Sequence, residues 1–153
     1  MADYQFKGEV NIPLMDATLK GLLAVPRKAK GLIVFSHGSG SSRHSPRNRL
    51  VAERLEEAQY ATLLFDLLTE AEEGDSAKRF EIDLLTERLV EVTDWLKSEE
   101  KTADLAIGYF GASTGAAAAL NAAANLGELV SAVVSRGGRP DMASPMLSSV
   151  PRC

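Results

Sequence analysis

Short, continuously apolar segments alternate with helix-like segments along most of this chain. Uninterrupted apolar runs of this kind are typical of parallel strands buried on both faces, with helices between them. The first two segments differ, because apolar residues there alternate and a short connection predicts an antiparallel hairpin. The predicted strands are residues 4–12, 18–25, 32–35, 61–65, 105–110 and 130–135, and the predicted helices begin at Pro46, between Asp75 and Asp83, and at Thr114. This order predicts an α/β fold: a mostly parallel, twisted sheet with helices on both faces and an N-terminal antiparallel hairpin.

Two of the helices show signals for their ends or buried faces. Ser45 is a good N-cap, and Pro46 suits the first helical position. The acidic segment 70–75 is predicted to be a solvated loop. The side chains expected to face the core are Leu50, Val51, Leu55 and Ala58 in the first helix, and Leu85, Leu89, Val92 and Leu96 in the second.

Composition excludes several classes of protein. The 153 residues are 45% hydrophobic and 25% charged, which fits one globular domain spanning residues 1–153 and excludes a disordered chain. The net charge of −4 argues against a nucleic-acid partner. No run of about 18 apolar residues and no secretory signal is visible, so a cytoplasmic protein without a membrane partner is expected. The single cysteine excludes a disulfide framework.

The segment Gly111 to Gly115 fits the pattern G-x-S-x-G between a predicted strand and a predicted helix. Glycines two places either side of a serine permit a tight strand-to-helix turn, which lifts the hydroxyl of Ser113 above the sheet. The backbone N–H of Thr114 would then point toward a reacting carbonyl at a helix N-terminus. The alternative is a plain glycine-rich turn that packs the helix onto the sheet.

A second loop supports the catalytic interpretation. His37, Gly38, Ser39 and Gly40 follow the first parallel strand, where a serine hydrolase of this architecture places its other oxyanion donor. The backbone N–H of Ser39 is the candidate. Two donors aimed at one oxyanion lower the barrier by several kcal/mol, about 2.7–4 for each.

The sequence resembles the α/β-hydrolase superfamily, and more closely its small dienelactone-hydrolase-like branch. The resemblance implies an acyl substrate and no cofactor, with Ser113 as nucleophile and Ser39 and Thr114 as backbone donors to the oxyanion. The segments on which it rests are Ser36 to Asn48, Phe65 to Thr69, Gly108 to Gly115 and Arg136 to Asp141.

The chain departs from the family pattern after Ser113. The family order is nucleophile, acid, histidine, whereas both histidines, His37 and His44, precede Ser113. By resemblance the chain is shortened by about two strands and a closing helix. Three hypotheses follow: a truncated hydrolase with vestigial activity, a base recruited from His44 or a second subunit, or a fold that has lost the chemistry. His37 is either a base or a support for its loop. No metal is expected, because histidines seven apart match no common ligand spacing.

Four arginines are expected at the carboxyl edge of the sheet, near Ser113. They could bind a carboxylate or phosphate of the substrate, because guanidinium groups bind such anions bidentately. They could equally form structural ion pairs with Asp66, Glu70 or Asp141. The four are Arg43, Arg47, Arg136 and Arg139.

Two other classes of function compete with a hydrolase. The last strand, residues 130–134, is apolar and has no Pro or Lys at its edge, which predicts a homo-oligomer that covers it and allows a non-catalytic oligomeric fragment. The second class is a nucleotide- or anion-binding module, with the Gly38 to Gly40 loop and Asp66 as a ribose-binding acid. Arg43 stands where that module needs its third glycine, and no phosphate-loop motif is present.

Overall fold

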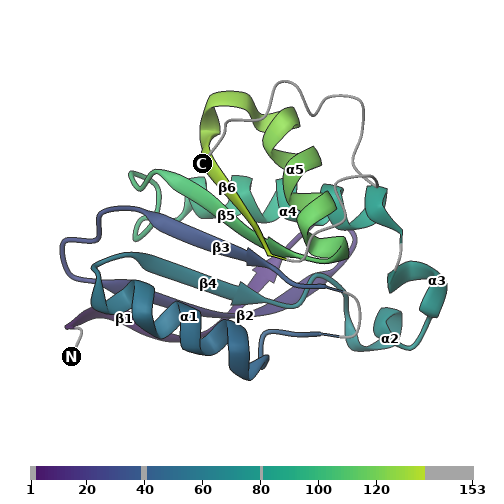
Figure 1. Cartoon of the computed structure of the whole chain (residues 1–153), viewed down its shortest axis with the longest axis horizontal. Coiled ribbons are helices and arrows are strands. Elements are labelled where there is room, and N and C mark those ends of the chain that lie inside the picture. The colour runs from purple at the N-terminus through teal and green to yellow at the C-terminus, as the bar shows by residue number, and fades with distance from the viewer. Residues whose placement is uncertain (1–2, 39–40, 80, 137–153) are drawn as a thin grey trace.

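A six-stranded sheet with helices on both faces forms the body of the protein (Figure 1), as seen in a computed structural model that describes residues 3–38, 41–79 and 81–136. The strand order is β1-β2-β4-β3-β5-β6. The pairs β1–β2 and β2–β4 are antiparallel, and the other three pairs are parallel. The predicted fold class is therefore confirmed. The strands are β1 (Tyr4–Pro13), β2 (Thr18–Pro26), β3 (Leu32–Ser36), β4 (Ala61–Phe65), β5 (Ile107–Ala112) and β6 (Val130–Arg136).

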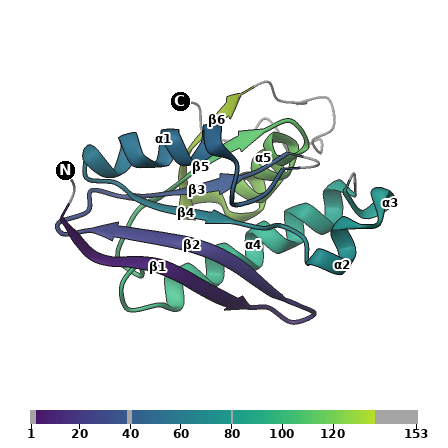
Figure 2. The ribbon, with the colours of Figure 1, turned by 90° about the horizontal axis from the view of Figure 1, so that it is seen from below.

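Local signals mark the start of α1 and the end of α5. Ser45 caps α1 by accepting a hydrogen bond from the backbone N–H of Asn48, and Pro46 is its first residue. Gly127, with φ of +59°, ends α5. Helix α1 lies on one face of the sheet, and α4 and α5 lie on the other (Figures 1 and 2). The helices are α1 (Pro46–Glu57), α2 (Glu70–Glu73), α3 (Ser76–Arg79), α4 (Ile82–Ser98) and α5 (Thr114–Leu126), with a 3₁₀ turn, η1 (Gly127–Leu129).

The larger core lies between the sheet and the α4–α5 face. The predicted face of α4 is confirmed, because its four apolar residues are 0–3% exposed. Four alanines of α5 pack beside them, and their small side chains bring this helix close to the sheet. The side chains from the two helices are Leu85, Leu89, Val92, Leu96, Ala118, Ala119, Ala122 and Ala123.

The predicted buried face of α1 is confirmed for Val51 and Leu55, which pack against the apolar cluster on this side of the sheet, and is wrong for Leu50 and Ala58. Leu50 is 55% exposed and Ala58 is also exposed, whereas Val51 and Leu55 are half-buried at the flanks. The buried residues of this helix are Asn48, Ala52 and Glu56. Helix α1 is rotated toward polar partners: Glu56 accepts hydrogen bonds from Tyr4 and Thr62, and Asn48 accepts one from Arg136.

Two further predictions need correction. The strand expected at residues 105–110 is β5, which begins at Ile107 and extends to Ala112, because it pairs with β3 as far as Gly111 and with β6 as far as Ala112. The acidic segment 70–75 contains α2, whose capping box joins Thr69 and Glu72. None of the helices in the described ranges combines the length and hydrophobicity that crossing a membrane requires.

Candidate active site

Ser113 stands at the junction of β5 and α5 in a strained backbone conformation. Its φ and ψ are +56° and −126°, and its side chain is exposed at the carboxyl end of the sheet. A non-glycine residue with positive φ costs of order 1–3 kcal/mol and persists only where the surrounding structure enforces it. The geometry is that of a sharp strand-to-helix turn that presents a serine hydroxyl.

The two flanking glycines are enforced by close packing. A Cβ atom on Gly115 would lie 2.1 Å from the carbonyl oxygen of Ser36, and one on Gly111 would lie 2.7 Å from the Cα of Ala116. Both distances are far inside van der Waals contact, so no larger residue fits without moving backbone. The G-x-S-x-G spacing therefore reflects the tight entry of α5 against β3 and β5.

The loop after β3 lies directly beside Ser113. The hydroxyl of Ser36 donates a hydrogen bond of 2.7 Å to the carbonyl oxygen of Gly115, which ties the end of β3 to the turn. A Cβ atom on Gly38 would lie 2.9 Å from the Cβ of Ser113. Thr114 is the buried first residue of α5, so its backbone N–H lies at the helix N-terminus. Ser39 falls outside the described residues.

His37 is buried, and both of its ring nitrogens are engaged. The backbone N–H of Leu67 donates to Nε2 at 2.9 Å. Nδ1 therefore carries the proton and donates to the carbonyl oxygen of Gly38 at 2.8 Å. Burial lowers the pKa of His37 from its usual 6.5, which favours this neutral form. The geometry agrees with support of the loop and leaves neither nitrogen available as a base.

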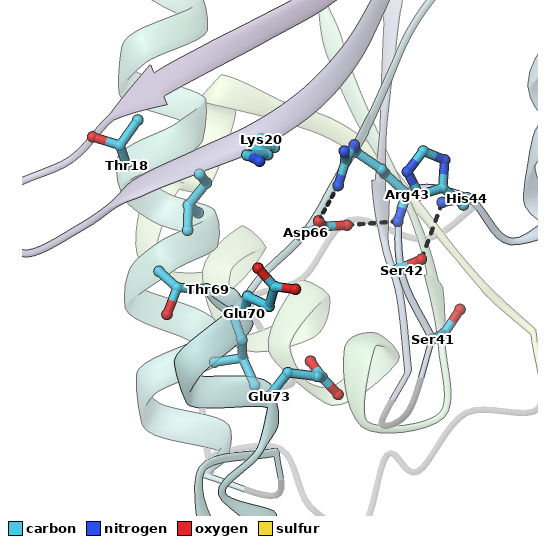
Figure 3. A pocket seen from close by; sticks show the side chains of 12 residues that line it. Thr18, Lys20, Ser41, Ser42, Arg43, His44, Asp66, Thr69, Glu70 and Glu73 are labelled. Atoms are coloured by element: carbon cyan, nitrogen blue, oxygen red, sulfur yellow. Dashed lines mark hydrogen bonds and ion pairs between the residues drawn. The ribbon is translucent and has the colours of Figure 1, made fainter.

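His44 is placed differently. Its side chain is exposed, and its backbone N–H donates to the hydroxyl of Ser42 at 3.2 Å. It lies in the wall of a pocket of about 380 Å³ at the carboxyl edge of the sheet, and most of the residues that line this pocket are polar or charged. In Figure 3 the loop that contains Ser42 and His44 forms one side of this pocket, and Glu70 and Glu73 of α2 form another. Ser113 is not among the lining residues, so the pocket and the turn are separate features of this edge.

The predicted arginines fall into different environments. Arg43 forms an ion pair with Asp66 through its guanidinium and also donates its backbone N–H to that carboxylate at 2.7 Å (Figure 3). This favours the structural interpretation for Arg43. Arg136 is the register partner of Ala112 in the sheet, donates to Asn48 at 3.2 Å and stacks over the ring of Phe110. Arg47 is exposed, and Arg139 lies outside the described residues.

A buried arginine near the site was missed by the sequence analysis. Arg88 of α4 is 1% exposed and makes a two-point ion pair with Glu72, at 2.9 and 2.7 Å. This hydrogen bonding lowers the pKa of Glu72 to about 2. Arg88 also donates to Asp16 and to the carbonyl oxygen of Leu67. The available signal was a charged residue directly beside Leu89 on an otherwise apolar stripe.

A mostly parallel sheet in which a strained serine directly follows β5, with Gly38 packed beside it, defines the class of α/β-hydrolase-fold proteins. A dienelactone hydrolase from Anabaena variabilis, known from a crystal structure, shares 53% sequence identity with this chain. The two structures superpose with a TM-score of 0.91, and the match covers 97% of this chain and 70% of that one. The chain therefore belongs to the dienelactone-hydrolase-like branch of the α/β-hydrolase superfamily.

Other comparisons extend this result. The protein Est1E from Butyrivibrio proteoclasticus shares the fold at 22% identity and a TM-score of 0.68, over 82% of this chain and 49% of that one. Two Mycobacterium tuberculosis proteins, each described as a "putative phosphoribosyl transferase", are 58% identical over 142 residues, which is 93% of this chain. The chain spans 32% of the length of these two relatives. No protein-family model matches it.

Proposed function

We propose that this chain is a serine-dependent hydrolase acting on an ester or a related acyl substrate. The observation that supports this most strongly is the strained backbone of Ser113, with φ of +56°, between two glycines that admit no side chain. Strain at an exposed hydroxyl is typical of a functional site. The similarity to a dienelactone hydrolase, at 53% identity, supports the same chemistry.

In the proposed reaction the Oγ atom of Ser113 attacks the acyl carbon and forms a tetrahedral intermediate. The backbone N–H groups of Ser39 and Thr114 are the proposed donors to its oxyanion. The intermediate collapses to an acyl-serine as the C–O bond to the alcohol breaks, and water then releases the acid. A base must accept the serine proton in the first step and return it to the leaving alcohol.

The general base is the group of the proposed site for which the chain offers the fewest candidates. The 153 residues contain two histidines, and both nitrogens of His37 are engaged by main-chain groups. If the chain itself supplies the base, His44 is therefore the candidate, because its ring is exposed on the loop that continues from Gly38. Without a base, the reaction would keep only the residual rate that binding and the oxyanion donors supply.

A fluorophosphonate probe tests the proposal directly, because it reacts with an activated serine and not with an ordinary one. We expect labelling of the native chain that is lost in Ser113→Ala. Ser131→Ala is the matched control, because Ser131 is exposed near the opposite end of the sheet, on β6. The Ser131→Ala variant should be labelled like the native chain. Labelling that survives in Ser113→Ala, or no labelling of the folded native chain, would contradict the proposal.

Phosphoribosyl transfer, the activity in the description of the mycobacterial relatives, has weaker support for this chain than acyl hydrolysis. That description applies to proteins of which the match spans only 32%. The part shared with this chain has the hydrolase fold of the Anabaena structure. For these 153 residues we therefore propose acyl hydrolysis rather than phosphoribosyl transfer.

Arg136 is the arginine that we propose for an acidic group on the substrate. Arg43 is neutralised by Asp66, whereas Arg136 is held by the neutral Asn48 and by the ring of Phe110. Its position in β6 is opposite Ala112, the residue before Ser113. Arg136→Gln should raise KM for an ester with a carboxylate more than KM for its neutral analogue; equal changes would argue against the role.

We further propose that β6 pairs with a second copy of the chain. In the described part of the sheet this strand is paired on one side only, by β5, and Val134 on it is 45% exposed. An uncovered apolar edge of this kind favours pairing. Light scattering should show a dimer at tens of micromolar that Val134→Lys weakens, and a monomer of the native chain would contradict the proposal.

A further inference from the structure

Arg88 connects three segments that are far apart in the sequence. Its guanidinium donates to Asp16 in the β1–β2 turn, to Glu72 of α2 and to the carbonyl oxygen of Leu67 after β4. The side chain of Arg88 is buried, at 1% exposure, and the two Nη atoms make all of these contacts. A buried charge requires such partners, so their positions depend on one another.

Leu67 extends this hydrogen-bond network from Arg88 to His37 at the edge of the sheet. Its carbonyl oxygen accepts from Arg88 at 3.1 Å, and its own backbone N–H donates to Nε2 of His37 at 2.9 Å. Leu67 is fully buried, so neither main-chain group exchanges its partner for water. The two main-chain groups of Leu67 therefore connect the guanidinium of Arg88 to the imidazole of His37 through hydrogen bonds.

His37 then links Leu67 to the loop that faces Ser113. Because Nε2 accepts from Leu67, Nδ1 donates to the carbonyl oxygen of Gly38 at 2.8 Å. Gly38 packs against Ser113 so closely that a Cβ atom there would lie 2.9 Å from the Cβ of the serine. The carbonyl of Gly38 and the N–H of Ser39 belong to the same peptide group, so a shift of the imidazole would move the peptide that contains the proposed oxyanion donor.

We propose that Arg88 is a positioning residue for the loop beside Ser113, acting through the main chain of Leu67 and the imidazole of His37. Its effect on the reactivity of Ser113 rests on the proposed hydrolase function, whereas its effect on His37 does not. The physical basis is that hydrogen bonds in a buried chain polarise and orient one another. A displacement of about 1 Å at the oxyanion loop is enough to cost about a hundredfold in rate.

The first test observes His37 by ¹⁵N NMR of the ring nitrogens, which distinguishes the two tautomers. The native chain should show a single Nδ1–H tautomer for His37, and His44, which is exposed, serves as an averaged reference in the same spectrum. His44→Gln assigns the signals. We expect Arg88→Gln and Arg88→Lys to shift the His37 signals toward those of His44, because neither side chain can reach Glu72 and Leu67 together as the guanidinium does.

A matched variant separates this effect from general loss of stability. Thr93→Val removes a buried hydroxyl on the same helix as Arg88, which hydrogen-bonds to the hydroxyl of Tyr109 at 2.5 Å and to the carbonyl oxygen of Leu89 at 2.8 Å, and neither bond involves Leu67 or His37. It should lower the melting temperature and leave the tautomer of His37 unchanged. An unchanged tautomer in both folded Arg88 variants would overturn the proposal. If Arg88→Gln does not fold, Arg88→Lys decides.

The second test measures the rate of fluorophosphonate labelling at Ser113. In Arg88→Lys the maximal labelling rate should fall about tenfold or more while the concentration for half-maximal rate stays the same, because binding groups are untouched. Thr93→Val should label at the native rate. A native rate in Arg88→Lys would overturn the link to Ser113. If the native chain itself is not labelled, the hydrolase proposal fails, and the NMR experiment still decides the link to His37.

Discussion

The two faces of the sheet are held by different interactions. The α4–α5 face has a continuous apolar core that includes Leu89 and Val92 and the alanines of α5. On the α1 face the fully buried apolar cluster consists of Phe35, Ala52 and Leu64. Helix α1 adds buried polar residues there, and Glu56 accepts hydrogen bonds of 2.6 and 2.7 Å.

This difference explains when an amphipathic pattern predicts the buried face of a helix. On α4 the apolar residues at helical spacing are the buried ones, because burial of their surface is the main favourable term. On α1 the partners of Asn48 and Glu56 lie on other elements, and satisfying these polar groups decides which face turns inward. The site also follows this division, because α5, which begins directly after Ser113, belongs to the apolar face.

The largest expected effect is at the close contact between α5 and β3. Gly115→Ala should lower the free energy of unfolding by about 3–5 kcal/mol or prevent folding, because the new Cβ would meet the carbonyl oxygen of Ser36 at 2.1 Å. Gly8→Ala on β1 is the control, since its Cβ would find only an ordinary contact at 3.6 Å. Urea unfolding of both variants measures this, and equal stabilities would show that the α5 contact is not tight.

Two leucine substitutions compare the faces directly. Leu89→Ala should cost about 3–4 kcal/mol, because this residue is fully buried in the apolar core. Leu55→Ala on α1 should cost about 1 kcal/mol, because Leu55 is half-buried and its truncation exposes less apolar surface. Both values come from denaturant unfolding. Equal losses would contradict the proposed difference between the two faces.

The ion pair at the edge of the α4–α5 face predicts a pH dependence. The pKa of Glu72 is lowered to about 2 from 4.5 by Arg88, so its contribution is complete above about pH 4.5 and is lost as pH falls toward 2. Glu72→Gln should cost about 1.5–3 kcal/mol near neutrality and should lose less stability than the native chain over this acidic range. Glu70→Gln, exposed on the same short helix, is the control. Parallel curves for Glu72→Gln and the native chain would contradict the assignment.

The smallest effect is expected at Leu50. This residue is 55% exposed although its spacing matches an apolar stripe, so Leu50→Lys should change stability by no more than about 0.5 kcal/mol. A chemical denaturation curve is sufficient to measure it. A loss similar to that of Leu55→Ala would restore the buried face that the sequence pattern predicts for α1.

Much of the fold could be predicted because its signals are local. Ser45 and Pro46 mark the start of α1, Gly127 marks the end of α5, and the glycines around Ser113 mark a tight turn. The strand β5 ends two residues later than predicted, because it pairs with β3 as far as Gly111 and with β6 as far as Ala112. Within the candidate site, the turn at Ser113 could be predicted in this way. The engagement of both nitrogens of His37 could not, since one partner is the backbone of Leu67.

The amino-acid sequence alone determined the elements, their order and the strained turn, because hydrophobic period, capping and glycine spacing act over a few residues. Tertiary structure decided the insertion of β4 between β2 and β3, the inward face of α1 and the burial of Arg88. The position of β4 depends on pairing between strands, whereas the inward face of α1 and the burial of Arg88 depend on polar groups that find partners in distant segments, as Arg88 does with Asp16 and Glu72. A buried charge or amide is stable only where such partners converge, and only the folded chain brings them together.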